Sequence, residues 1–427
     1  MDEIPTIEDV YSEFVPFLKR NEPVIVRIPL EGWELCAESV LCPDNEELRR
    51  EEVPVDVEGK ARTTMTLGKF LDLANKSSAS GGVVYCKDWH IDQCAQLRGK
   101  YTVPICFRDD WLNWYCQRVE AEDDYSFCYV GTKGSKTGFH HDVCSSYSWS
   151  VNLCGVKRWR LWLRESHNAD DPCIDLLQHP GDAIFVPSGC YHEVENLGTM
   201  NLGNSGDDDP GHSMVVSVNR NWLNGFSIRR VYRFLEREHK SVQAELMDLY
   251  KPATQPTKCV FNTPPPLMSS EEWHRHCDVI LLANAAMNWK SFLRLLTARL
   301  LFMASALPFM GVELGEIHLM KTAAGTFHGE GRIVELDQQS LEQFELQRRT
   351  YVSSSKSGDS GTTSPTSVWS HTLSEVAAVL ESIRGDVDLL SAFTHIFAPH
   401  SRETLVSALG ELLSFCRSPE RSEAGLS

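Results

Sequence analysis

The pattern His-x-Asp occurs three times in the chain, at residues 90–92, 140–142 and 276–278. Two imidazoles and one carboxylate can occupy one face of an octahedral iron ion and leave three coordination positions open. A His-x-Asp pair supplies two of these ligands only if both side chains point the same way. The residue types are those of a non-haem iron site, and the elements around each triplet decide which one could form it.

Strand geometry favours the triplet that contains His140 and Asp142. Residues two apart on a β-strand point to the same side, so this pair at a strand end would face one metal ion. His276 lies in a segment predicted to be helical, where residues two apart diverge by about 200°. His90 lies where a strand should end and a helix begin. We therefore expect His140 and Asp142 to be the metal-binding pair.

The third ligand must come from a neighbouring strand that is distant in the sequence. The segment from Gly181 to His192 has this form, because a turn and a buried strand are followed by a Pro-Ser-Gly corner at residues 187–189 and then by a histidine. We expect His192 to complete an iron site with His140 and Asp142. His141 would point to the opposite face and is expected to be a packing or surface residue.

Composition and charge narrow the class of protein. The chain has 427 residues, 42% of them hydrophobic, which suits a globular protein with a core. The formal net charge of −18 argues against a general nucleic-acid binder, because phosphate contacts need a basic face. The 14 cysteines include no C-x-x-C pair, so neither a zinc ribbon nor a thioredoxin motif is supported.

The first residues are acidic and lack the pattern of a signal peptide, and no stretch is long and apolar enough to span a bilayer. We expect a protein of a reducing compartment, cytoplasmic or else nuclear, with free and mostly buried thiols and no membrane or direct nucleic-acid contact. The oligomeric state is unknown at this stage.

The chain is expected to form four regions. Residues 1–82 are predicted to be an N-terminal flank of helices and strands, and residues 83–226 hold short strands at the density of a sandwich or barrel. Residues 227–303 are predicted to be helical, and residues 304–427 to hold further helices around a disordered segment at 352–367. Residues 202–213 are predicted to form an exposed loop. The specific predictions are helices at 7–18, 67–73, 228–249, 271–303, 373–384 and 404–416, and strands at 24–28, 83–86, 127–130, 146–154, 159–163, 183–186 and 215–219.

Five segments in this order resemble the successive strands of a JmjC double-stranded β-helix. They are residues 137–142, 148–152, 155–159, 181–192 and 217–222. Residues 85–90, 148–152, 221–226 and 273–277 more narrowly resemble the lysyl hydroxylases of translation release factor one within this family. The similarity covers roughly residues 5–300, and the 202–213 insertion departs from the family pattern. The resemblance implies an α+β jelly-roll, cupin-like barrel, with the JmjC segment at about residues 101–240, between the N-terminal flank and a C-terminal helical region.

The resemblance also implies Fe(II), 2-oxoglutarate and O2, with ascorbate as the reductant in an assay. Lys157 should pair with the distal carboxylate of 2-oxoglutarate through a charge-assisted bond. Tyr85, Thr137 and Asn219 would lie near the same molecule. Ser150 stands where several relatives have Asn, and Asn152 lies on the same strand face, so either of the two could reach it.

The reaction implied is C-4 hydroxylation of a lysine side chain in release factor one, a protein partner whose modification would support translation termination. No catalytic residue is expected beyond the metal site, because no acid–base pair or nucleophilic triad stands out. One alternative is N-methyl-lysine demethylation of histones by the same chemistry, which the absence of a reader-domain pattern disfavours. The other is a non-catalytic metal-binding cupin that serves as an interaction module, against which the complete ligand set and Lys157 argue.

Overall fold

The computed structural model describes residues 4–118, 124–163, 168–198, 214–247, 268–306, 326, 338–352 and 366–417. The predicted loop at 202–213 and most of the segment at 352–367 lie outside these residues. The chain forms two compact units. The first contains residues up to Asp142 and Ser146–Leu223, and the second contains Val143–Ser145 together with Asn224 onward.

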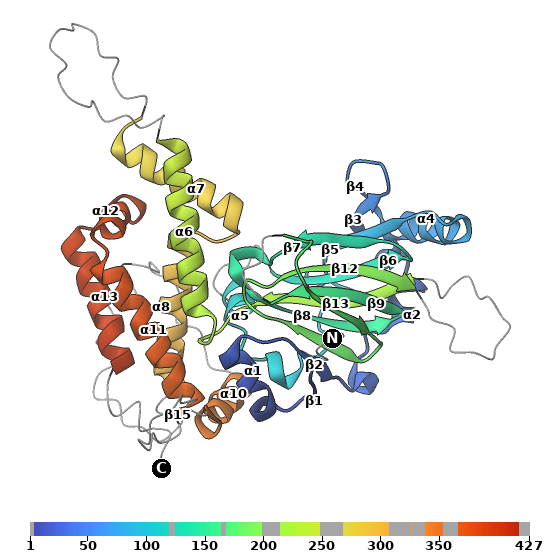
Figure 1. The fold of residues 1–427 in the computed structure, drawn as a ribbon, viewed down its shortest axis with the longest axis horizontal. Helices are drawn as coiled ribbons and strands as arrows, with labels where there is room; N and C mark the ends of the chain where they lie inside the picture. Colours follow the sequence, from blue (N-terminus) through green and yellow to red (C-terminus); the bar gives the residue numbers. More distant parts are fainter. Residues whose placement is uncertain are drawn as a thin grey trace, which may run out of the picture. The chain divides into compact units, whose positions relative to one another are not determined.

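Two β-sheets form the frame of the first unit (Figure 1). One has nine strands in the order β1-β2-β11-β8-β13-β6-β5-β3-β4, and the other has four in the order β10-β9-β12-β7. The strands are β1 (Thr6–Glu8), β2 (Val24–Arg27), β3 (Glu52–Val57), β4 (Thr63–Thr66), β5 (Val84–His90), β6 (Ser126–Thr132), β7 (Lys136–His140), β8 (Tyr147–Cys154), β9 (Val156–Trp162), β10 (Ile174–Gln178), β11 (Asp182–Val186), β12 (Tyr191–Gly198) and β13 (Met214–Trp222).

The strands from β6 to β13 form a double-stranded β-helix. Strands β6, β8, β11 and β13 lie in the larger sheet, whereas β7, β9, β10 and β12 make up the smaller one, and all neighbours within each set are antiparallel. The two sheets share a core, because Trp159 and Leu161 of β9 belong to one buried cluster with Ile184 and Val186 of β11. The α+β jelly-roll expected from the sequence is confirmed.

The outer face of the larger sheet is covered by helix α1 (Tyr11–Arg20). The ring of Phe14 lies edge-on to Phe185 of β11, with 4.9 Å between ring centroids. The helix ends at Asn21, whose left-handed φ of 56° is typical of a helix C-cap. The prediction that the helix begins at Ile7 was wrong, because Ile7 lies in β1 and pairs in parallel with Val26.

Helices of the first unit also differ from prediction in length and number. The helix expected at 67–73 continues to Ser80 and ends at Gly81, whose φ of 75° is left-handed. The remaining short helices were not predicted. They are η1 (Leu30–Gly32), α2 (Ala37–Leu41), α3 (Glu46–Arg49), η2 (Ile105–Phe107) and α5 (Trp111–Arg118).

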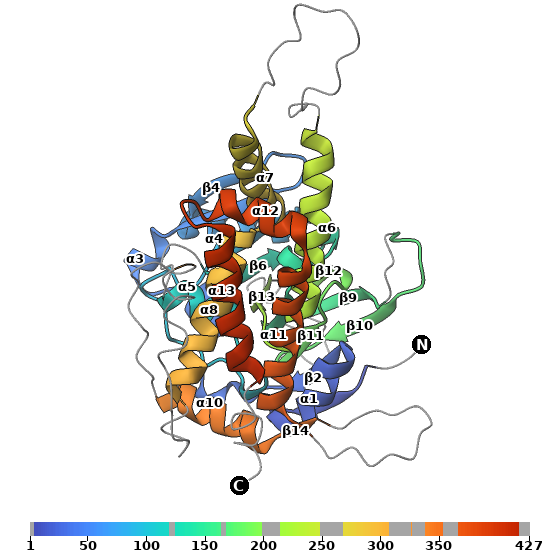
Figure 2. The same ribbon diagram turned by 90° about the vertical axis from the view of Figure 1, so that its left-hand side faces the viewer.

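The second unit is helical, and Figure 2 shows α11 and α13 running side by side. The predicted helix at 271–303 is in fact two helices, because Ala286 takes a left-handed φ of 56° between them. Among the described residues, no helix is both long and apolar enough to cross a bilayer. The elements are η3 (Val143–Ser145), α6 (Ile228–Leu246), α7 (Ser270–Ala285), α8 (Trp289–Ala306), α10 (Gln338–Arg349), β14 (Tyr351–Val352), β15 (Thr366–Ser367), α11 (Val368–Gly385), α12 (Val387–Ile396) and α13 (Arg402–Arg417).

Candidate metal centre

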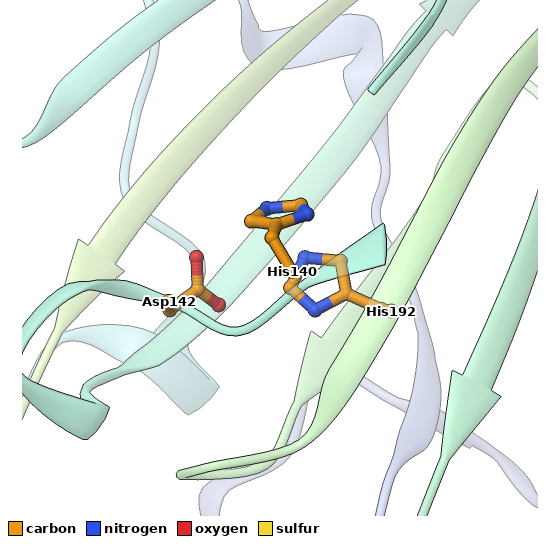
Figure 3. A group of neighbouring side chains, drawn as sticks. All are labelled: His140, Asp142 and His192. Carbon is orange, nitrogen blue, oxygen red and sulfur yellow. The ribbon is translucent and has the colours of Figure 1, made fainter. Parts of the chain in front are cut away.

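The three predicted metal ligands lie together in the first unit (Figure 3). His140 ends β7, Asp142 follows two residues later, and His192 stands near the start of β12. The two histidines are direct partners across the β7–β12 pair, and their ring centroids are 4.2 Å apart. One ligand atom from each of the three residues lies within 4.8 Å of the others, so a single ion could contact all three.

Hydrogen bonds set the tautomer of both imidazoles. The Nδ1 atom of His140 lies 2.8 Å from the carbonyl oxygen of Gly138, and that of His192 lies 3.1 Å from the carbonyl oxygen of Cys190. A carbonyl can only accept, so each Nδ1 carries the proton and each Nε2 keeps its lone pair for a metal. Burial lowers the pKa of His192 to about 4, which keeps this ring neutral at physiological pH.

The carboxylate of Asp142 is held by a neighbouring hydroxyl. Ser148 Oγ of β8 donates to Asp142 Oδ2 over 2.7 Å, which leaves the other carboxylate oxygen for a metal. The donors are therefore two neutral imidazoles and one carboxylate, the set that non-haem Fe(II) sites use when three further positions stay open. The residues present fit iron.

The two rival triplets do not form such a group among the described residues. His90 ends β5 and pairs with Asp124 over 3.3 Å. His276 lies on helix α7 with its Nδ1 2.9 Å from the carbonyl oxygen of Glu272, one turn earlier. Asp278 instead accepts hydrogen bonds from Asn288 Nδ2 and from the backbone N–H of Trp289. The strand-based choice of His140 and Asp142 agrees with this geometry.

Lys157 is a fully buried lysine without a carboxylate partner among the described residues. It lies on β9, is 1% exposed, and donates through Nζ to Ser217 Oγ of β13. Burial lowers the pKa of Lys157 to about 7, and electrostatic interactions with Cys128 and Cys154 act against this shift. A buried ammonium without a counter-ion is unfavourable, so the carboxylate of a bound ligand fits here.

Hydrogen bonds connect Lys157 to two further predicted residues. Asn219 Oδ1 accepts from Ser217 Oγ over 2.9 Å and from Ser150 Oγ over 3.0 Å. Asn152 instead donates from Nδ2 to the carbonyl oxygen of Gly155 over 2.7 Å. The sequence left open whether Ser150 or Asn152 reaches the cosubstrate. In the structure Ser150 belongs to the hydrogen-bond network of Lys157, whereas the amide of Asn152 binds the backbone.

Thr137 and Tyr85 are joined by a side-chain hydrogen bond. The β7–β12 register shifts between His192 and Val194, so two residues of β7 oppose one of β12 there and Thr137 faces the same way as His140. Burial raises the pKa of Tyr85, and hydrogen bonds with Thr137 and Asn196 act in the opposite direction.

Asn196 and Ser217 are candidate site residues that the sequence analysis missed. Asn196 is buried on β12 and lies directly opposite Lys157 on β9, and its Oδ1 has no hydrogen-bond partner among the described residues. It follows His192 by four residues on one strand, so strand alternation could have placed it on the interior face. Ser217 precedes Asn219 by two residues on β13, so strand alternation could have placed it on the same face as Asn219.

Comparison with known proteins agrees with this architecture. A family model described as a JmjC domain, hydroxylase, matches residues 160–204. The 2-oxoglutarate and iron-dependent oxygenase JMJD4 of Homo sapiens is 31% identical over 270 residues, which are 56% of this chain and 57% of that protein. The protein of the same name from Danio rerio is 33% identical over 248 residues, 52% of this chain and 51% of its own.

An arginine-specific demethylase, JMJ20 of Arabidopsis thaliana, is 30% identical over 295 residues, 56% of this chain and 60% of its own length. The chain thus spans between about half and three fifths of the relatives that it matches. The match to the JmjC family model at residues 160–204, the order of the strands in the two sheets, and the cluster of His140, Asp142 and His192 agree with a JmjC-type barrel.

Proposed function

We propose that the protein is an Fe(II)- and 2-oxoglutarate-dependent oxygenase. The observation that carries the proposal is the buried ammonium of Lys157 in the same barrel as the three metal ligands. A metal-binding cupin without a dicarboxylate cosubstrate has no need of an uncompensated lysine there. The names of the JMJD4 relatives, which specify 2-oxoglutarate and iron, support the same conclusion.

The residues would divide the work as follows. His140, Asp142 and His192 would hold Fe(II), and Lys157 would bind the distal carboxylate of 2-oxoglutarate. Iron with 2-oxoglutarate and O2 supplies the oxidation of an unactivated C–H bond, coupled to formation of succinate and CO2. Ser148 orients Asp142, and the buried side chains of β9 and β11 exclude water from the interior.

The substrate that we propose is a lysine side chain of translation release factor one, hydroxylated at C-4. Support comes from the resemblance at residues 85–90, 148–152, 221–226 and 273–277 to the release-factor lysyl hydroxylases. A net charge of −18 is compatible with a basic protein segment as substrate. A cytoplasmic location, with the nucleus as second choice, belongs to the same proposal, as does a role in translation termination.

Demethylation is the second candidate, because the name of the Arabidopsis relative specifies an arginine demethylase. Both outcomes use the same site, so the product must decide. Release factor one and methylated histone peptides, with methyl-lysine or methyl-arginine, are incubated with the protein, Fe(II), ascorbate and 2-oxoglutarate. Mass spectrometry then distinguishes a gain of one oxygen on lysine from the loss of a methyl group.

The same assay can reject both candidates. A gain of oxygen on a lysine of the release factor, absent with His140→Ala, is the result that we expect. Loss of methyl from a histone peptide, with the release factor unchanged, would replace hydroxylation by demethylation. Bound metal without succinate from any of these substrates would favour the interaction-module alternative.

A further inference from the structure

Tyr129 of β6 lies at the centre of the groups that would surround the cosubstrate. Its backbone is paired with Ser217, whose hydroxyl accepts from Lys157. Its ring centroid is 5.8 Å from Lys157 Nζ, within the range of a cation–π contact, and 5.9 Å from the ring of Tyr85. The position of this ring therefore limits where the Lys157 ammonium can lie.

The free end of Tyr129 is held by a residue outside the site. Tyr129 Oη donates to Asp88 Oδ1 over 2.7 Å. The other oxygen of Asp88 accepts from Arg62 over 2.9 Å, and Arg62 also donates to the carbonyl oxygen of Lys87 over 2.7 Å. Arg62 belongs to the connection between β3 and β4, so the N-terminal flank contributes the last member of this chain of contacts.

The backbone at Asp88 is shaped for this contact. Asp88 has a φ of 60°, a left-handed conformation that non-glycine residues rarely adopt but that Asp and Asn tolerate best. It lies where the β5–β6 register shifts between Cys86 and Trp89, so β5 carries one extra residue there. The bulge changes the direction of the Asp88 side chain, and its carboxylate accepts from Tyr129.

We propose that Asp88, braced by Arg62, is a positioning residue that holds Tyr129 and, through its ring, the Lys157 ammonium in place for the distal carboxylate of 2-oxoglutarate. The inference rests on the proposed function, because it assigns a role in binding that cosubstrate. It concerns affinity for the dicarboxylate and not the metal, since the hydrogen bond that it assigns, from Tyr129 Oη to Asp88 Oδ1, involves none of the three metal-ligand candidates.

Direct binding tests this role without turnover. Calorimetric titration of 2-oxoglutarate into the full chain loaded with Mn(II) should show a dissociation constant about three- to tenfold higher for Tyr129→Phe, which removes one hydroxyl. Asp88→Gly, which keeps the left-handed backbone accessible, should weaken binding by a similar factor. The double variant should bind 2-oxoglutarate no more weakly than the single variant of lower affinity, because both changes remove the same hydrogen bond.

Two further variants separate positioning from general damage. Asp88→Asn keeps an acceptor and tolerates the left-handed backbone, so it should recover most of the affinity lost in Asp88→Gly. Asp56→Asn is the matched control, because Asp56 also lies near Arg62, at 3.9 Å, without a contact to Tyr129 in the structure. In turnover assays the KM for 2-oxoglutarate should rise in Tyr129→Phe while kcat at saturation and Mn(II) affinity stay unchanged.

The outcomes distinguish this inference from the proposed function. Wild-type protein that binds no 2-oxoglutarate would overturn both. Wild-type binding that Lys157→Ala weakens, but that Tyr129→Phe and Asp88→Gly leave unchanged, would overturn the positioning role alone. A loss of Mn(II) affinity or of folding in Tyr129→Phe would also contradict it, because the change would then not be specific to the cosubstrate.

Discussion

The ammonium of Lys157 donates to the hydroxyl of Ser217 across the two sheets of the barrel, and no carboxylate of the described residues pairs with it. Ser217 Oγ in turn donates to Asn219 Oδ1, so the hydroxyl accepts one hydrogen bond and donates another. A neutral hydroxyl cannot balance a buried charge. This unbalanced site is the reason to expect a dicarboxylate ligand, and it leads to the first two predictions.

Removing the charge of Lys157 should weaken cosubstrate binding strongly. Lys157→Ala should raise the dissociation constant for 2-oxoglutarate by about a hundredfold or more, because the ligand carboxylate would then be buried without a partner. Arg158→Ala is the control, since Arg158 is next in the chain but exposed and paired with Asp175. Equal affinities of Lys157→Ala and wild type would move the carboxylate partner elsewhere.

Cosubstrate binding should also depend on pH. Burial lowers the pKa of Lys157 to about 7, and a bound carboxylate stabilises the protonated form, so binding takes up a proton. Affinity should be highest below about pH 7 and fall by about tenfold for each pH unit above it, until the pKa of the complex is reached. Calorimetry from about pH 6.5 to about pH 8.5 measures the slope. Lys157→Arg should remove most of this pH dependence, because arginine stays charged throughout the range. An affinity of the wild-type protein that does not change with pH would refute the assignment of Lys157 as the carboxylate partner.

Ser148 should matter for the metal, whereas Ser150 should not. Ser148 donates to the Asp142 carboxylate, so Ser148→Ala should lower Fe(II) affinity by about tenfold or more, as the loss of such outer contacts does. Ser150 faces the same side of β8 but donates to Asn219, so Ser150→Ala should keep the metal affinity. Anaerobic Fe(II) titration compares the two variants. The opposite order would show that Ser148 does not orient the ligand.

Gly131 of β6 should tolerate no side chain. A Cβ there would overlap Ser135 Oγ and lie 2.8 Å from Cδ2 of Tyr85. Gly131→Ala should therefore reduce the free energy of unfolding by about 1–3 kcal/mol and weaken 2-oxoglutarate binding, since Tyr85 must move. Gly138 has no neighbour within 4 Å of an added Cβ, so Gly138→Ala should be near neutral. Thermal unfolding measures both, and equal losses would show that Gly131 has room.

Local patterns sufficed to predict the metal ligands. His140 and Asp142 share a side because of strand alternation, which is a property of consecutive residues, and the turn–strand–corner form of residues 181–192 pointed to His192. The cluster of His140, Asp142 and His192 could thus be predicted before any contact between distant strands was known. The helix boundary near Ile7 was not, because pairing of β1 with β2 overrides the apolar spacing there.

Contacts that depend on register or on bulges could not be predicted. Asn196 meets Lys157 only in the observed β9–β12 register, and a shift by one residue would turn it away. Thr137 faces inward only because of the shift in β7–β12 pairing, so strand alternation alone would have turned it outward, and its place was expected only from the resemblance. The break at Ala286 has no glycine or proline to announce it, so one predicted helix proved to be two.

The central claim is that His140, Asp142 and His192 bind Fe(II) and that this site consumes 2-oxoglutarate. The most direct measurement is succinate formation by the purified full chain with Fe(II), ascorbate, 2-oxoglutarate and release factor one, compared with His192→Ala at equal concentration. We predict succinate from the wild-type protein and none above background from the variant. Equal succinate formation by the two proteins would contradict the claim.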